Sequence, residues 1–395
     1  MNRSLKPDSR ATREASIAPD APISGSLPGV PSNDTDADAA QLTGRGGPGF
    51  FARFWRNLAF IDFWCAGYLF VLLGLTLTAT GPGRDKAIGT VVFDIALYGA
   101  LLLVTRGGVL RHGSFANAML YRVAIYFPLF FSYFEMKWIG PAVSPHSVDG
   151  DLLAFDMKVF GYEPAVAWDK FVNPTTTEWF SFFYFGYFFL LCLHVLPMMF
   201  NSGSRFRLAH FALGLALIIG PAHILYMLVP GFGPYHYLAG QFSHELEGGM
   251  FLRLVKATVE AGGSQKDIFP SLHTAIPVFF ATFSFIHRRS YPWRYWWPFM
   301  MFTASQIMIA TMFLRWHYVI DVIVGLALSI SAAVISHKIT RWEFARRRER
   351  GVPPTFTLLE WPWRSASGES DEHDETEDRV ASTTSESQKQ DRGTT

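Results

Sequence analysis

Residues 208–229 read LAHFALGLALIIGPAHILYMLV and contain no Asp, Glu, Lys or Arg. An apolar run of this length spans the roughly 30 Å hydrocarbon core of a bilayer when it forms a helix. A helix suits that setting because it satisfies its backbone hydrogen bonds internally. The run therefore predicts a transmembrane helix. Similar stretches lie on both sides of it, and the eight predicted spans cover roughly residues 57–79, 88–105, 116–138, 176–200, 208–229, 271–287, 295–314 and 318–338.

The composition of the 395-residue chain agrees with this pattern. Half of the residues are hydrophobic and only 17% are charged, whereas soluble proteins carry about a quarter charged residues. The formal net charge of +1 argues against a nucleic-acid partner. Both cysteines, Cys65 and Cys192, fall inside apolar runs, which argues against a disulfide framework or a zinc site. We expect an all-α polytopic membrane helix bundle of about eight transmembrane helices.

Three regions follow from how polarity changes along the chain. Residues 1–47 are rich in Pro, Gly, Ser and Asp and contain no apolar run, which predicts a disordered N-terminal segment. Residues 48–345 form the predicted transmembrane domain. Residues 346–395 start with arginines and continue with the acidic run ESDEHDETED at 369–378, which predicts a disordered tail that is first basic and then acidic.

Arginines mark one side of the predicted membrane domain. If the spans alternate in direction, that side carries Arg53, Arg56, Arg106, Arg111, Arg205, Arg207, Arg288, Arg289, Arg294, Arg341, Arg346, Arg347, Arg348 and Arg350. The positive-inside rule makes it cytoplasmic. We therefore expect a multi-pass protein of the cell inner membrane with both termini in the cytoplasm. Arg84 and Lys86 are exceptions, and the neighbouring Asp85 partly offsets their charge.

Two polar clusters lie at the opposite, non-cytoplasmic boundary. They are KDIFPSLHT, residues 266–274, and LRWHYVID, residues 314–321. His317 and Asp321 are four positions apart, so on a helix they share one face, and the carboxylate is placed to orient the imidazole. Ser271 stands where a helix begins, and the free N–H groups of a first turn favour a bound phosphate.

Together, these residue types point to phosphoryl transfer. One histidine, His273 or His317, would attack phosphorus while the other protonates the leaving oxygen, and cations with N–H groups would hold the developing charge. A single histidine at a membrane boundary is more often an interfacial residue, and a lone His–Asp pair is as often structural as functional. His194 and His223, which lie inside apolar helices, are read as packing or hydrogen-bonding residues. The coincidence of two clusters on one face favours the functional reading.

The two motifs also carry a family resemblance. FPSLHT followed by RWHYVID resembles the type 2 phosphatidic acid phosphatase superfamily, whose signature is P-S-x-H and a later H-x-x-x-D. PSLH at residues 270–273, the His317–Tyr318 pair and PGFGPYHY at residues 230–237 are more similar to its inositolphosphotransferase branch, which includes inositol phosphorylceramide synthases. The resemblance covers roughly residues 120–340 and implies a six-helix phosphatase-like core.

The resemblance implies a role for each matching residue. His317 would form a phosphohistidine, Asp321 would orient and stabilise it, His273 would protonate the leaving group, and Ser271 would bind phosphate oxygens. It implies no metal and no other cofactor. The substrate would be a phospholipid or another lipid-linked phosphate taken from the bilayer.

The chain departs from the family pattern at two places. The first basic motif, K-x6-R-P, is absent, and Thr311 stands where an Arg often precedes the second histidine. Other cations must then bind the phosphate. We expect Arg315 to do so first and Lys266 second, although a lysine in such a loop is slightly more often a solvated charge. Two further basic residues stand behind them, Arg253 and Lys256.

The sequence thus favours a membrane phosphotransferase that is inositolphosphotransferase-like and acts at the periplasmic or extracellular face. A lipid phosphate phosphatase would use the same site with water as the acceptor. A non-catalytic scaffold or a transporter is the alternative of another class. For the acids within the predicted spans, Asp94 and Glu135, we expect a structural ion pair with Arg122 rather than a transport path.

Overall fold

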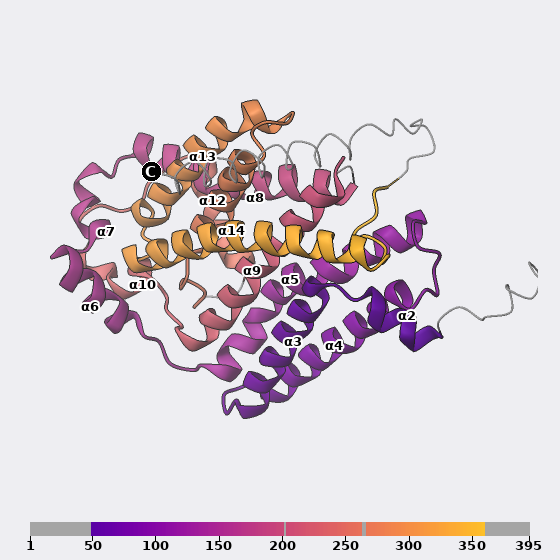
Figure 1. Cartoon of the computed structure of the whole chain (residues 1–395). Coiled ribbons are helices and arrows are strands. Elements are labelled where there is room, and N and C mark those ends of the chain that lie inside the picture. Colours follow the sequence, from indigo (N-terminus) through magenta and orange to yellow (C-terminus); the bar gives the residue numbers. More distant parts are fainter. Residues whose placement is uncertain (1–48, 201–202, 263–265, 360–395) are drawn as a thin grey trace, which may run out of the picture. The chain divides into compact units, whose positions relative to one another are not determined.

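The computed structural model describes residues 49–200, 203–262 and 266–359, and within these residues the chain is helical with no strand. Figure 1 shows its long helices packed together as a bundle. Eight of them correspond to the predicted spans: α3 (Phe60–Thr78), α4 (Arg84–Arg106), α5 (Phe115–Val143), α8 (Pro174–Phe200), α9 (Arg205–Leu228), α12 (Leu272–Ile286), α13 (Trp293–Phe313) and α14 (Val319–Glu349). The predicted all-α polytopic bundle is therefore confirmed.

Six of these eight helices, all except α12 and α13, are long and apolar enough to cross a membrane. α12 is a shorter apolar helix. Large apolar side chains on the outside of the bundle are exposed, among them Phe63, Phe70, Phe189 and Phe302. Exposed apolar surface of this extent suits contact with lipid. These features indicate a multi-pass integral membrane protein.

Short helices occupy the connections. α2 (Phe50–Asn57) precedes the first long helix. The connection between α5 and α8 holds α6 (Asp149–Phe160), α7 (Pro164–Ala167) and η1 (Asp169–Phe171), and the one between α9 and α12 holds α10 (Pro234–Tyr237), η2 (Ala239–Gln241) and α11 (Met250–Gly262). Both connections lie at the end of the bundle where α12 and α14 begin, which we call the histidine end. We call the opposite end, where α4 ends and α5 begins, the arginine end.

Close helix packing sets the position of the histidine end. α12 packs against α9, α13 and α14. A Cβ on Gly214 of α9 would clash with the Phe279 ring of α12, so glycine is required for this approach. A Cβ on Gly325 of α14 would lie 2.7 Å from the Ser271 carbonyl oxygen. The first turns of α12 and α14 are therefore held close together, which fits the use of small residues where membrane helices approach.

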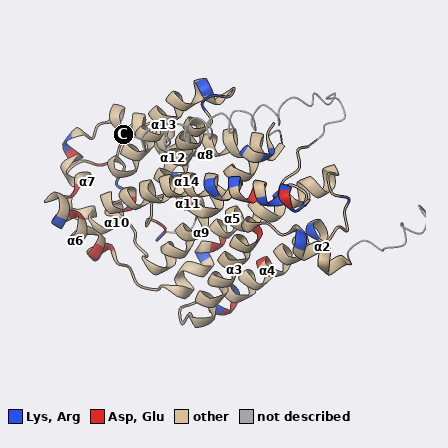
Figure 2. Cartoon of the chain, viewed as in Figure 1, with Lys and Arg blue, Asp and Glu red and all other residues tan. Residues whose placement is uncertain are grey.

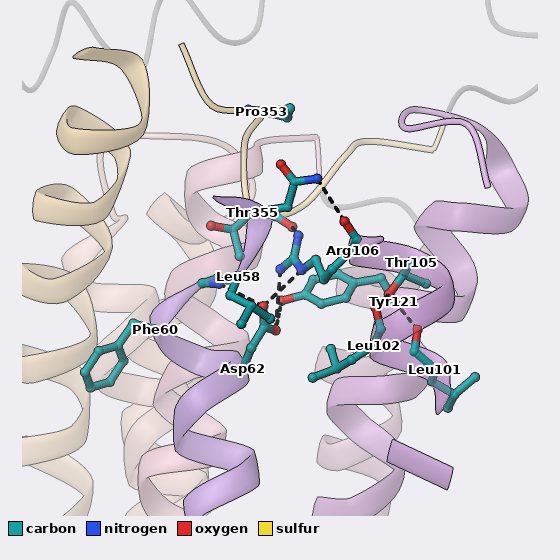
Figure 3. A network of polar contacts seen from close by, with 12 residues as sticks. Leu58, Phe60, Asp62, Leu101, Leu102, Thr105, Arg106, Tyr121, Pro353 and Thr355 are labelled. Carbon is teal, nitrogen blue, oxygen red and sulfur yellow. Dashed lines mark hydrogen bonds and ion pairs between the residues drawn. The ribbon is translucent and has the colours of Figure 1, made fainter. Parts of the chain in front are cut away.

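The arginine end is closed by an ordered segment of the C-terminal region. Figure 2 shows Lys and Arg gathered around α2 and the last turns of α14. In Figure 3, Arg106 donates from Nε to Asp62 at 2.9 Å and from Nη1 to the Thr355 carbonyl at 3.1 Å, while the Tyr121 hydroxyl donates to Asp62 at 2.7 Å. Phe356 is buried against the Tyr121 ring.

This arrangement corrects the predicted start of the disordered tail. α14 continues to Glu349, and residues 352–359 pack on the bundle, so the boundary at 345 lies too early. The physical reason is that Arg347, which looked like part of a solvated basic run, is buried and donates from Nη1 to the Pro353 carbonyl at 2.8 Å. The predicted disorder of residues 1–47, and of the tail beyond 359, falls outside the described residues.

The expected ion pair of Arg122 with Asp94 or Glu135 is also wrong. Arg122 donates from Nη1 to the Ala118 carbonyl at 2.9 Å and from Nη2 to the Thr357 carbonyl at 2.7 Å. Arg122 stands near the start of α5, whereas Glu135 lies several turns further along it, toward the histidine end. The arginine thus helps to fasten the C-terminal segment.

Candidate active site

The two sequence motifs meet at the histidine end. The Ser271 N–H donates to the Asp321 carbonyl oxygen at 3.1 Å, which joins the start of α12 to the first turn of α14. The imidazole rings of His273 and His317 lie 6.3 Å apart between centroids. One phosphate group placed between rings at this separation is in reach of both. The structure therefore brings together the residues expected to act on one phosphorus atom.

His317 and Asp321 form a contact at the turn before α14. His317 Nδ1 lies 3.3 Å from Asp321 Oδ2, and the same oxygen accepts the Tyr318 N–H at 3.0 Å. Both side chains are buried. Burial lowers the pKa of His317 to about 4, against an opposing effect of the nearby Asp267 carboxylate. At neutral pH the imidazole is therefore uncharged, as a nucleophile must be.

Aromatic rings of α8 position His273. Its imidazole stacks on Tyr184, with centroids 4.3 Å apart and planes 13° from parallel, and it also contacts the Tyr187 ring at 4.3 Å. Its Nε2 is buried, and no hydrogen-bond partner reaches it from the part of the chain that the structure describes. The ring is fixed in orientation while one polar atom stays unpaired.

Ser271 takes the capping position expected from its place in the sequence. Its Oγ accepts the Thr274 N–H at 3.2 Å, which satisfies one of the free donors in the first turn of α12. Because this hydroxyl oxygen acts as an acceptor, its own hydrogen remains available to donate to an anion.

Arg315 is engaged away from the two histidines. Its Nη2 donates to Asp169 Oδ1 at 2.8 Å and to the His244 carbonyl at 2.6 Å, and its guanidinium lies 3.9 Å from the centroid of the Phe242 ring. Burial tends to raise the pKa of Asp169, but hydrogen bonds and the Arg315 charge outweigh it and lower that pKa. The positive charge of Arg315 is thus already balanced.

The other expected cations also lie elsewhere. Lys266 Nζ donates to the carbonyls of Pro145 and His146 at 2.8 and 2.9 Å. It therefore anchors the connection after α5. Arg253 and Lys256 are exposed on α11. Among the described residues, Lys266 makes its hydrogen bonds to these two carbonyls and not to His273 or His317.

Asp267, which sequence reasoning passed over, lies close enough to His317 to act on its charge. Burial raises the pKa of Asp267 to about 6, and the nearby Tyr133 of α5 opposes this rise. Its place inside the first motif was the only available signal. The site therefore holds a second carboxyl group besides Asp321.

Two buried carboxylates of α6 secure the start of α14. Asp149 accepts the Tyr318 hydroxyl at 3.1 Å and the Gly233 N–H at 2.8 Å. Asp156 accepts the N–H groups of Val319 and Ile320 at 2.6 and 3.1 Å, which caps α14. No sequence signal linked them to this helix, because they stand more than 150 positions before it.

Glu163 completes this group of carboxyls. Its Oε1 accepts the Ala165 N–H at 3.1 Å, and the Asp156 carboxylate lies close enough to act on its charge. Burial, followed by the nearby negative charge of Asp156, raises the pKa of Glu163 to about 8. Glu163 is therefore mostly protonated at neutral pH, beside Asp156, the residue that caps α14.

Comparisons with known proteins add one finding. No curated protein and no solved structure gives a significant match to this chain. A family model described as the PAP2 superfamily matches residues 151–335, which include both histidine motifs and the α6 capping residue Asp156. α2 to α5 precede the match. The match supports the PAP2 superfamily for this part of the chain, and with it a lipid phosphatase-like or phosphotransferase-like function.

Proposed function

We propose that this chain is an integral membrane phosphotransferase that acts on a lipid-linked phosphate through a phosphohistidine on His317. The observation that carries the proposal is the convergence of the His273 and His317 rings, 6.3 Å apart, at the N-terminus of α12. The family match agrees with this chemistry in its general class.

In the first step the lone pair of His317 Nε2 attacks phosphorus, and the bond between phosphorus and the leaving oxygen breaks. The proton that the leaving oxygen needs comes from His273, which starts this step as the imidazolium beside the negatively charged phosphate and leaves it neutral. Asp321 faces His317 Nδ1 and stabilises the ring as it becomes positively charged. The products of this step are the phosphohistidine and the released alcohol.

In the second step an acceptor hydroxyl attacks the phosphohistidine. Its oxygen bonds to phosphorus, the bond from phosphorus to Nε2 breaks, and the now neutral His273 takes the hydroxyl proton. The enzyme returns to its starting state with no net proton change. A lipid alcohol or a polyol as acceptor makes the protein a transferase, which the likeness of PSLH and HY to the inositolphosphotransferase branch favours.

Water as the acceptor would make the same site a lipid phosphate phosphatase. The site lies at the end of the bundle opposite to most arginines, and the positive-inside rule then puts it at the non-cytoplasmic face with both termini in the cytoplasm. We propose that a substrate reaches it with its tail in the lipid and its phosphate at the boundary.

The proposal is tested with purified protein in lipid nanodiscs and a radiolabelled phospholipid. We expect transient label on the protein that is labile in acid and stable in alkali, and no label on His317→Ala. His146→Ala is the matched control, because His146 is exposed at the same end of the bundle. Full activity of His317→Ala would refute the phosphohistidine mechanism, whereas a wild type without activity on any lipid phosphate would favour a scaffold or transporter.

Adding acceptor alcohols separates the two reactions. A transferase releases less free phosphate and forms labelled product as the acceptor concentration rises. Phosphate release that no acceptor alters would establish the phosphatase reading instead.

A further inference from the structure

The cations expected to bind phosphate already have partners, yet buried nitrogen atoms at the histidine end lack them. Arg315 is paired with Asp169 through Nη2, and Lys266 is held by two backbone carbonyls. The Nε of Arg315, the Nε1 of Trp316 and the Nε2 of His273 are buried with no partner among the residues that the structure describes, and the last two belong to uncharged or weakly basic rings. Such unpaired buried groups are uncommon in folded proteins, and each calls for an explanation.

We propose that the indole N–H of Trp316 binds a non-bridging oxygen of the substrate phosphate. Trp316 directly precedes His317, the proposed nucleophile. Its ring lies 6.3 Å from that of Tyr184, the same ring that stacks on His273 at 4.3 Å. Trp316 and His273 thus lie beside the same Tyr184 ring, and the His317 ring lies 6.3 Å from that of His273. This assignment rests on the proposed function, since it names the group that holds its substrate.

The backbone around Trp316 is held firmly enough for such a role. The N–H groups of Trp316 and His317 both donate to the Thr311 carbonyl, at 3.0 and 3.2 Å. On the other side, Gly233 packs against the Trp316 carbonyl so closely that a Cβ would clash with it. Gly233 also has a φ of +87°, which favours glycine. The indole is therefore presented by a fixed turn.

The aromatic neighbours of Trp316 orient its ring. The Tyr235 ring lies 4.9 Å away on one side, and the Tyr235 N–H donates to the Arg315 carbonyl at 2.6 Å. An indole N–H only donates, so the partner it lacks must be an acceptor. The oxygens of a phosphate are strong acceptors, and the first turn of α12 offers further N–H groups to the same anion.

This arrangement holds an anion mainly with neutral donors. Preorganised N–H groups in a site with little water stabilise negative charge without a cation. The Arg315 guanidinium would then act at a distance, with its charge already offset by Asp169. Thr311, standing where the family often has an arginine, provides only its backbone carbonyl to this turn.

Orthovanadate, a phosphate analogue, tests the assignment by direct binding to the purified full-length chain. Trp316→Phe keeps an aromatic ring and removes the N–H. We expect it to weaken vanadate binding by about 10-fold to 100-fold, the range for a lost hydrogen bond to a charged group. Trp168→Phe is the matched control. Trp168, like Trp316, packs against the buried apolar cluster that includes Tyr184 and Phe313, and we expect its substitution to leave vanadate binding unchanged.

The possible outcomes separate this inference from the proposed function. Unchanged vanadate affinity in Trp316→Phe overturns the assignment and leaves the phosphohistidine mechanism intact. Wild-type protein that binds no vanadate overturns both. Should Trp316→Phe fail to fold, as judged by size-exclusion chromatography, Trp316→Tyr is compared in its place. Its affinity must fall as well for the assignment to stand, and an affinity equal to the wild type overturns it.

Discussion

Replacing Glu163 with Gln should change how activity depends on pH. Glu163 keeps its proton at neutral pH and lies beside Asp156, which caps α14 through the N–H groups of Val319 and Ile320 at 2.6 and 3.1 Å. Loss of that proton puts a second negative charge beside Asp156. Repulsion then weakens the cap of the helix that carries Asp321.

The size of the effect follows from the pKa of Glu163, which burial raises to about 8. With that pKa about one-tenth of the molecules keep the proton at pH 9, so wild-type activity should fall about tenfold between pH 7 and pH 9. Gln has nearly the same shape as Glu and does not titrate. The titratable groups that face Glu163 are Asp156 and, at longer range, Asp321.

The free energy of unfolding should also depend on pH through the protonation of Glu163. The folded chain keeps the Glu163 proton between its ordinary pKa of 4.5 and about 8, whereas the unfolded chain releases it. Folded molecules therefore bind more protons in this window, and the free energy of unfolding falls as pH rises through it. It levels off above about pH 8. Glu163→Gln removes this slope.

The assay is initial rate on a lipid phosphate in nanodiscs from pH 6 to pH 9.5, together with thermal melting over the same range. Glu247→Gln, an exposed carboxyl at the same end of the bundle, serves as the control and should behave as the wild type does. A Glu163→Gln protein that keeps the wild-type alkaline decline in both measurements would show that this carboxyl does not govern the cap.

Four further outcomes are expected. Asp321→Asn should lower the initial rate by roughly two to four orders of magnitude, as for other histidines that lose their orienting carboxylate. Asp169→Asn leaves the Arg315 guanidinium without its partner and should lower the melting temperature by several degrees, measured in detergent. Phe356→Ala should lower stability by about 3–5 kcal/mol, followed by chemical denaturation, with an unchanged initial rate per folded molecule. Lys266→Ala should change the initial rate by less than about twofold, because its ammonium group serves only backbone carbonyls.

The long helices could be predicted because lipid favours apolar runs that cover the bilayer, and six of the eight predicted spans are helices long and apolar enough to do so. The observed helices agree with the prediction within a few residues, except that α14 runs on to Glu349 rather than ending near 338. The extension was hidden because arginines in its last turns resemble a solvated basic run. Arg347 instead donates to the Pro353 carbonyl, which belongs to a segment whose folding depends on the bundle.

The histidines of the site could be predicted, but their surroundings could not. His317 and Asp321 stand four positions apart, and helical geometry alone brings them together. Arg315 and Asp169 are 146 positions apart, and only the fold of the connection between α5 and α8 makes them a pair. The residue types therefore predicted a cation near the site, Arg315, but they did not show that Asp169 already balances its charge.

The fastened segment 352–359 has a topological consequence. The Phe60 N–H bonds Glu343 at 3.0 Å, so the first and last long helices are tied together at the end where the described chain both starts and finishes. The first and last long helices of the linear chain therefore lie next to each other in the bundle. A circular permutant that joins residue 359 to residue 49 through a short linker, and reopens the chain in the 107–114 turn, would keep every helix in its original direction.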